Sequence, residues 1–169
     1  MGFPRPDEAA AHYSTYIGRI SGDDVLGVLE SQLRDTTVLF SGISEEKSLH
    51  RYAPDKWSIR QVLNHVNDTE RVFAFRAFWF ARGFSDAMPS FDQNVSATAA
   101  RADAYPWADH VQEFQKIRQA TVALFRNLPD EAWARSGIAS GMLVTVNALA
   151  YIIAGHAAHH IAILQERYL

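Results

Sequence analysis

Apolar residues recur at three- and four-residue spacing along most of this chain, and this periodicity constrains the fold more than any other feature. In the segment 23–41 the pattern is carried by Val25, Leu29, Leu33 and Phe40. Residues at this spacing lie on one face of an α-helix, so the segment predicts an amphipathic helix with one buried stripe. Strict alternation, which indicates strands, is rare in the chain. The sequence therefore predicts an all-α protein.

Four long helices follow from the periodicity and from the residues at the segment ends. We predict them over about 23–41, 58–82, 106–128 and 145–169. Ser58 and Gln61 form a capping box at the start of the second helix. Pro106 suits the first turn of the third helix, and Thr145 is a suitable N-cap for the fourth.

The connections between these helices are unequal. Residues 1–20 indicate an N-terminal arm, and residues 84–105, rich in small and polar side chains, indicate a long crossover loop. A small hairpin fits the glycines Gly137 and Gly141 before the last helix. Four helices with two longer connections predict a single four-helix-bundle domain over residues 1–169. Unequal loops also allow a non-sequential order of helices, which periodicity does not fix.

Composition excludes several classes of protein. With 169 residues, of which 48% are hydrophobic, the chain buries a core without further cross-links. It has no cysteine, which excludes disulfides, thiolate metal sites and cysteine nucleophiles. A net charge of −3 provides no field that attracts phosphate backbones, so we expect no nucleic-acid partner.

Membrane and export signals are weak. The apolar stretches around 72–81 and 143–158 are interrupted by polar residues and fall short of the ~20 apolar residues of a membrane span. Residues 1–7 lack the pattern of a signal peptide. We therefore expect a cytoplasmic protein with no membrane partner.

Two histidines of the last predicted helix are spaced for metal binding. His156 and His160 are four residues apart, about 40° in azimuth on a helix, so both side chains project from one face. That face is apolar above and below the pair, so the pair points into the bundle. Buried neutral imidazoles need partners for their ring nitrogens, and a metal ion is one such partner. His159 diverges from His160 by about 100° and is predicted at a rim or interface.

A third ligand must come from another helix, and His65 of the second helix is the candidate. It shares a face with Val62 and Thr69. Three histidines around an open coordination position are typical of catalytic rather than structural metal sites. Asp68, one turn further on, is a candidate to accept a hydrogen bond from a ligating histidine, to be a fourth ligand or to act as a base. The competing interpretation, a metal-free bundle with hydrogen-bonded core histidines, stays open.

Other residue sets are interpreted as structural. The aromatic set is predicted to form core and subunit interface, which favours a homodimer; it consists of Phe73, Phe75, Phe78, Trp79 and Phe80. The neighbouring arginines are predicted on a solvated or ion-paired face; they are Arg71, Arg76 and Arg82. The remaining histidines are predicted at the surface; they are His12, His50 and His110. The sequence has neither a phosphate-binding glycine loop nor a nucleophile elbow.

Several motifs in this order resemble the DinB-like (DinB/YfiT) superfamily of metal-dependent enzymes. The motifs are Tyr52–Arg60, Val62–His65, Asp68–Arg71, Phe91–Asn94 and Ala150–His160. The resemblance covers about residues 16–169 and implies an up-up-down-down four-helix bundle that is usually dimeric. It also implies a metal, typically nickel or zinc, held by a histidine of the second helix and a His-x-x-x-His pair of the fourth. These positions correspond to His65, His156 and His160.

The resemblance also implies a class of activity. Members of the superfamily include hydrolases and transferases or isomerases that use low-molecular-weight thiols such as bacillithiol or mycothiol. We therefore predict a metal-dependent hydrolase or thiol-dependent transferase acting on an unknown small molecule, assisted by Asp68 or Glu70. Asp92, in the crossover loop, is a candidate for shaping the pocket. The alternative is a non-catalytic dimeric bundle that binds a metal or a small molecule.

Overall fold

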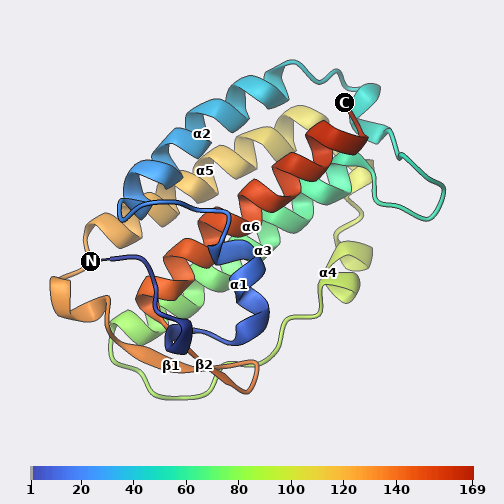
Figure 1. Ribbon diagram of the computed structural model, residues 1–169. Coiled ribbons are helices and arrows are strands. Elements are labelled where there is room, and N and C mark those ends of the chain that lie inside the picture. Colours follow the sequence, from blue (N-terminus) through green and yellow to red (C-terminus); the bar gives the residue numbers. More distant parts are fainter. Residues whose placement is uncertain (1) are drawn as a thin grey trace.

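Four long helices form the body of the protein (Figure 1). They are α2 (Val25–Ser41), α3 (Ile59–Ala81), α5 (Trp107–Arg126) and α6 (Val146–Arg167). Their buried apolar side chains form two core clusters between them. The computed structural model describes residues 2–169, so Met1, the first residue of the predicted arm, lies outside the described residues. The predicted all-α four-helix bundle is confirmed.

The long helices are arranged so that sequence neighbours are not always spatial neighbours. α3 packs against α5 and α6, and α2 packs against the same two helices. Figure 1 shows α2 and α6 running in one direction and α3 and α5 in the other. Around the bundle the helix directions are therefore up, up, down, down.

Polar caps fix where the long helices begin. Ser58 and Gln61 form the predicted capping box. The Ser58 backbone N–H donates to Gln61 Oε1 at 3.0 Å, and the Gln61 backbone N–H donates to Ser58 Oγ at 3.1 Å. Thr145 Oγ1 accepts from the backbone N–H of Ala148 at 3.0 Å and so caps α6. Pro106 is the N-cap residue of α5 rather than part of its first turn. The predicted helices are thus accurate to within a few residues at their starts.

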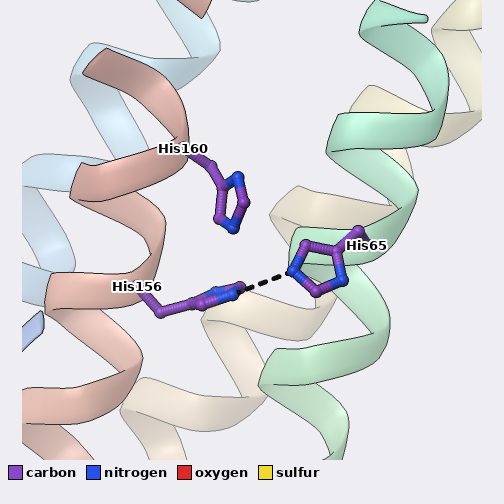
Figure 2. A group of neighbouring side chains, drawn as sticks. All are labelled: His65, His156 and His160. Atoms are coloured by element: carbon purple, nitrogen blue, oxygen red, sulfur yellow. Dashed lines mark hydrogen bonds between the residues drawn. The ribbon is translucent and has the colours of Figure 1, made fainter. Parts of the chain in front are cut away.

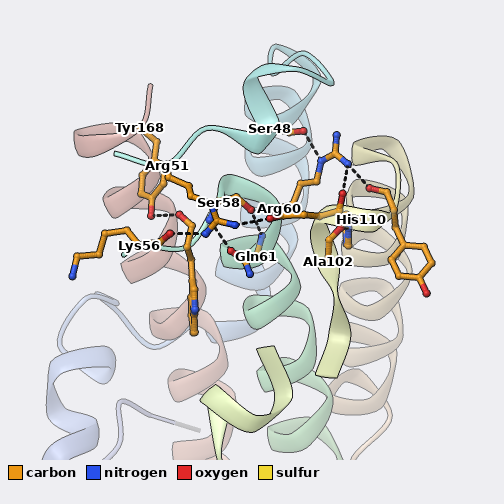
Figure 3. Close-up of polar contacts among 12 residues, drawn as sticks. Ser48, Arg51, Lys56, Ser58, Arg60, Gln61, Ala102, His110 and Tyr168 are labelled. Carbon is orange, nitrogen blue, oxygen red and sulfur yellow. Dashed lines mark hydrogen bonds and ion pairs between the residues drawn. The ribbon is translucent and has the colours of Figure 1, made fainter. Parts of the chain in front are cut away.

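A buried arginine joins three segments near the start of α3 (Figure 3). Arg60 is 4% exposed and donates to Ser48 Oγ at 2.7 Å and to the Glu45 carbonyl at 3.0 Å. It also donates to the Tyr105 carbonyl just before α5. The α2–α3 connection, which contains the single-turn helix Lys47–Leu49, is thereby fixed to the end of the crossover segment.

The last helix is the most deeply buried one. Its N-terminal half, from Val146 to Ala157, is buried on all sides, and only its later turns reach the surface. By length and composition α6 would suffice to cross a membrane, with a mean hydropathy of 1.2. However, 67% of that apolar stretch is buried inside the bundle, which accounts for its composition.

The predicted N-terminal arm packs on α6. It contains the single-turn helices Pro6–Glu8 and Ala11–Tyr13 and the short helix α1 (Ser14–Ile17). The two backbones approach closely at Gly155, where a Cβ atom would lie 2.0 Å from the carbonyl oxygen of Tyr16. Glycine at this position of α6 is therefore required by the contact with α1.

The crossover between α3 and α5 is more regular than predicted. It contains the helix α4 (Gln93–Ala100) and the single-turn helix Ala102–Ala104. Asp92 caps α4 by accepting from two backbone N–H groups, at 2.9 and 3.1 Å. The prediction of a loop over 84–105 was wrong here because its small residues, Ala, Ser and Thr, are compatible with a short helix once a cap is present.

A two-stranded hairpin precedes α6, as the two glycines suggested. It pairs β1 (Ser136–Ala139) with β2 (Met142–Thr145) in antiparallel register and follows the single-turn helix Asp130–Ala132. The two turn residues, Ser140 and Gly141, have φ of 54° and 78°, as in a two-residue hairpin turn. The crossover segment joins its edge through Met88, which bridges to Ala139.

Candidate metal centre

Three histidines from two helices meet inside the bundle (Figure 2). His65 projects from α3, and His156 and His160 project from successive turns of α6. One ring nitrogen of each lies within 4.8 Å of the others. The structure thus brings together the three predicted residues, although 91 positions separate His65 from His156 in the chain.

The spacing of the ring nitrogens suits a single small cation. The Nε2 atoms of His65 and His156 are 3.1 Å apart, and the ring centroids are 4.5–4.9 Å apart across the three pairs. Zinc–nitrogen bonds of about 2.0–2.1 Å in tetrahedral geometry place two ligand nitrogens roughly 3.3 Å apart. Within residues 2–169 no carboxylate joins this group. The three residues therefore fit a three-ligand site with an open position.

Burial keeps the three imidazoles neutral. His65 and His156 are each 4% exposed. Desolvation lowers the pKa of His65 to about 4 and that of His160 to about 3. The neighbouring His65 lowers the pKa of His160 further. The pKa of His156 is lowered mainly by burial and, to a smaller extent, by the neighbouring His160. Neutral imidazoles offer the lone pair that a metal ion requires.

Neighbouring side chains orient the histidines. Thr69, one turn after His65 on α3, has its Oγ1 3.4 Å from His65 Nδ1, so that the Nε2 atom faces the other two rings. A partner on the far nitrogen is the usual way to fix a ligating histidine. The ring centroid of Trp57 lies 5.1 Å from that of His65. The ring centroid of Tyr16, in α1, lies 5.2 Å from that of His156.

A cavity of 210 Å³ opens beside the histidines. Both His65 and His156 line it, together with residues from the N-terminal arm, the crossover segment and the hairpin turn. Its polar lining includes Tyr13, Arg76 and Ser140. A small molecule bound there would contact His65 and His156.

The two predicted catalytic carboxylates take different positions. Asp68 accepts from Asn64 at 3.0 Å and from Ser96 of α4 at 2.9 Å, and it pairs with Arg71 at 3.3 Å. Its negative charge acts to raise the pKa of His65, against the larger effect of burial. Asp68 therefore lies near the histidine cluster but also fixes α4 to α3.

Glu70 is not brought to the histidines. Both of its carboxylate oxygens accept from Arg118 of α5 at 2.8 Å, and the two side chains are 3% and 0% exposed. Arg118 also donates to Gln32 of α2 at 2.7 Å. Because Arg118 occupies both oxygens, the geometry gives Glu70 a role in joining helices rather than the predicted role in catalysis.

Some remaining sequence predictions were wrong in informative ways. His110 was expected at the surface but is 5% exposed, with Nε2 2.9 Å from the carbonyl oxygen of Ala102. Arg76 was expected on a solvated or ion-paired face but is 3% exposed and lines the cavity. Its position eleven residues after His65, on the same helix face, was the available signal.

Other predictions agree with the structure. His12 and His50 are exposed, although His12 also lines the cavity, which the sequence reasoning missed. His159 lies at the rim, half-buried beside Tyr16. Of the aromatic set, predicted to form core and subunit interface, Phe73 and Phe80 are buried in the core. Phe75 and Phe78 are exposed, and the subunit interface stays a prediction.

Comparison with known proteins agrees with this architecture. A model of the DinB superfamily matches residues 29–164. YfiT from Bacillus subtilis, described as a probable metal-dependent hydrolase with an unusual four-helix bundle topology, superposes with a TM-score of 0.72. The match has 18% identity and covers 96% of this chain and 89% of that one. No curated protein matches the chain in sequence.

Two further structures share the fold. A mycothiol-dependent maleylpyruvate isomerase superposes with a TM-score of 0.68 at 12% identity, over 82% of this chain and 58% of that longer one. A DinB-like protein, YjoA from Bacillus subtilis, gives a TM-score of 0.55 at 19% identity, over 85% and 88% of the two chains.

Proposed function

The chain belongs to the DinB superfamily, and on that premise we propose that it is a metal-dependent enzyme. In this proposal His65, His156 and His160 hold one divalent transition-metal ion, nickel or zinc. The observation that carries the proposal is that His65 and His156, two of the three clustered histidines, line a cavity of 210 Å³. A structural site would be closed by a fourth ligand, whereas a catalytic one keeps a position open to a pocket.

The residues of the chain provide the conditions for such a site. Burial holds the imidazoles neutral at physiological pH, and Thr69 fixes the orientation of His65. His65 and His156 are buried and line the cavity, whereas His160 is half-buried. When bound, a divalent metal supplies Lewis acidity that activates a water molecule or a thiol.

Two reaction classes are proposed, hydrolysis and thiol-dependent transfer or isomerisation. The described activity of YfiT supports hydrolysis, and the mycothiol dependence of the isomerase supports transfer or isomerisation with a low-molecular-weight thiol. Asp68, whose charge acts on His65, is the proposed proton-transfer group, because both carboxylate oxygens of Glu70 accept from Arg118. The expected cytoplasmic location stays a prediction.

A non-catalytic dimeric bundle is the second candidate function. Exposed aromatic side chains on α3 favour an interface, with Phe75 and Phe78 49% and 36% exposed. An interface is compatible with an enzyme, however, and the cavity beside the histidines favours catalysis.

Metal-dependent turnover tests the proposal. Metal-stripped protein is reloaded with nickel or zinc and assayed on ester and amide panels, and on thiol addition and isomerisation with mycothiol or bacillithiol. We expect turnover only in the loaded protein, with a loss of at least about a hundred-fold in His65→Ala. The exposed His50→Ala serves as the control and should keep wild-type activity. Turnover that is equal in stripped and loaded protein would contradict the proposal, and loaded protein inactive on every panel would favour the non-catalytic bundle.

A further inference from the structure

Within residues 2–169, one buried cation has no carboxylate within ion-pair distance. Three arginines are buried in the described chain, namely Arg60, Arg76 and Arg118. Arg118 pairs with Glu70, and Arg60 pairs with Glu45. None of the ion pairs found within residues 2–169 includes Arg76, although its side chain is 3% exposed.

The protein contacts of Arg76 are neutral. Its Nη2 donates to the carbonyl of Pro89 at 2.7 Å and to Ser140 Oγ at 3.1 Å, and its guanidinium lies 5.7 Å from the centre of the Phe73 ring. Desolvation of a charge is costly and is normally offset by an opposite charge. An arginine stays protonated even when buried. The fold therefore holds a positive charge that no carboxylate of residues 2–169 approaches within ion-pair distance.

This charge faces the cavity beside the histidines. Arg76 lines the same 210 Å³ space as His65 and His156. His65 and Arg76 are eleven residues apart on α3, about 16 Å along the axis. Helical side chains lean toward the helix N-terminus, so the guanidinium is displaced from its own Cα toward His65. The cavity is thus lined by a cation and by two of the three candidate metal ligands.

We propose that Arg76 binds a carboxylate of the substrate, so that the enzyme acts on a small carboxylic acid whose reacting group lies at the three histidines. This inference rests on the proposed function. One guanidinium balances the single charge of a carboxylate. Ser140, whose hydroxyl accepts from Arg76, and Tyr13 line the same cavity and offer hydroxyl groups to such an anion. The volume is below the roughly 300–1,000 Å³ of pockets for drug-sized ligands, so the acid is small.

Binding of propionate to metal-stripped protein isolates the carboxylate contact from any contact with an ion. Titration is followed by ¹H–¹⁵N NMR, including the Arg76 Nε–H signal, with propionamide as the uncharged isostere. We expect propionate to shift signals of Arg76 and Ser140 saturably and propionamide to have no effect. In Arg76→Met propionate should bind at least about ten-fold more weakly, the loss expected for a hydrogen bond to a charged group.

Two further variants separate charge from folding. Arg82→Met removes an exposed arginine of the same helix region and should bind propionate as the wild type does. Arg76→Lys keeps the positive charge and should retain part of the affinity, even if Arg76→Met folds poorly. Unchanged propionate binding in both Arg76 variants would overturn the inference, and so would tighter binding of inorganic phosphate than of propionate.

The outcome is separable from that of the proposed function. Arg76-dependent propionate binding by a protein that takes up no metal would support the anion site and remove the metal site. Metal-dependent turnover with no propionate binding in the wild type would support the metal site and overturn only the proposed carboxylate site.

Discussion

Burial decides the protonation state of the histidines at the centre of the bundle. An imidazole in water is half-protonated near pH 6.5, whereas desolvation lowers the pKa of His65 to about 4 and that of His160 to about 3. The charged form is disfavoured inside the bundle, and the neutral form is the one that ligates metal. Burial of these histidines therefore favours the protonation state in which an imidazole binds metal.

Acid should destabilise the metal-stripped protein through these histidines. Below pH 6.5 the unfolded chain takes up protons that folded His65 does not bind until about pH 4, so the free energy of unfolding falls as the pH falls through that window. Between pH 7 and pH 5 we expect His65 alone to account for a loss of roughly 2 kcal/mol. Urea unfolding of metal-stripped wild type and His65→Gln at both pH values measures the difference. The exposed control His50→Gln should follow the wild type, and equal losses in wild type and His65→Gln would refute this assignment.

At the scale of elements, α6 links the site to the rest of the molecule. It contributes two of the three histidines, and its other faces contact α1, α2 and α3. The arm lies against the site because α1 approaches α6 at Gly155, the residue before His156. This close approach, together with the hydrogen bonds that Thr145 and Asn147 donate to Glu8 of the arm, places Tyr13 and Tyr16 beside the cavity.

A methyl group at position 155 should displace the arm. In Gly155→Ala the added Cβ would lie 2.0 Å from the Tyr16 carbonyl oxygen, so we expect a loss of about 1–3 kcal/mol in the free energy of unfolding. We also expect faster proteolysis within residues 2–20. Gly42→Ala is the matched control, since its Cβ would meet only an ordinary contact at 3.5 Å. An unchanged stability and an unchanged digestion pattern in Gly155→Ala would show that the close approach is not maintained.

The helices were predictable from sequence where local chemistry determines them. The capping box at Ser58 and the cap at Thr145 act within one turn, and the His156–His160 spacing fixes two side chains on one helix face. Features that depend on contacts between distant segments were not predictable. The burial of His110 requires the crossover segment to pass over it, and the pairing of Glu70 depends on Arg118 from another helix.

At the scale of the whole molecule, exposed aromatic side chains indicate a partner surface. Phe75, Phe78 and Phe84 are 49%, 36% and 47% exposed, and the Phe84 ring stacks on Trp79 at 4.2 Å. Grouped exposed aromatic side chains commonly mark an interface. The expected homodimer would bury these rings.

Sedimentation equilibrium tests the dimer. We expect wild-type protein to have twice the mass of the 19.0 kDa chain at micromolar concentration, and Phe75→Lys combined with Phe78→Lys to be monomeric. Val38→Lys changes an apolar side chain that is 72% exposed on α2 and should remain dimeric. A monomeric wild type would contradict the dimer without affecting the metal site.

Metal analysis by mass spectrometry tests the central claim most directly. It is applied to tag-free wild type, to His156→Ala combined with His160→Ala, and to His50→Ala as the exposed control. We predict close to one nickel or zinc ion per chain in the wild type and the control, and its loss in the double variant, because one remaining imidazole makes a weak site. A wild type without metal after reconstitution, or a double variant that retains it, would contradict the three-histidine centre.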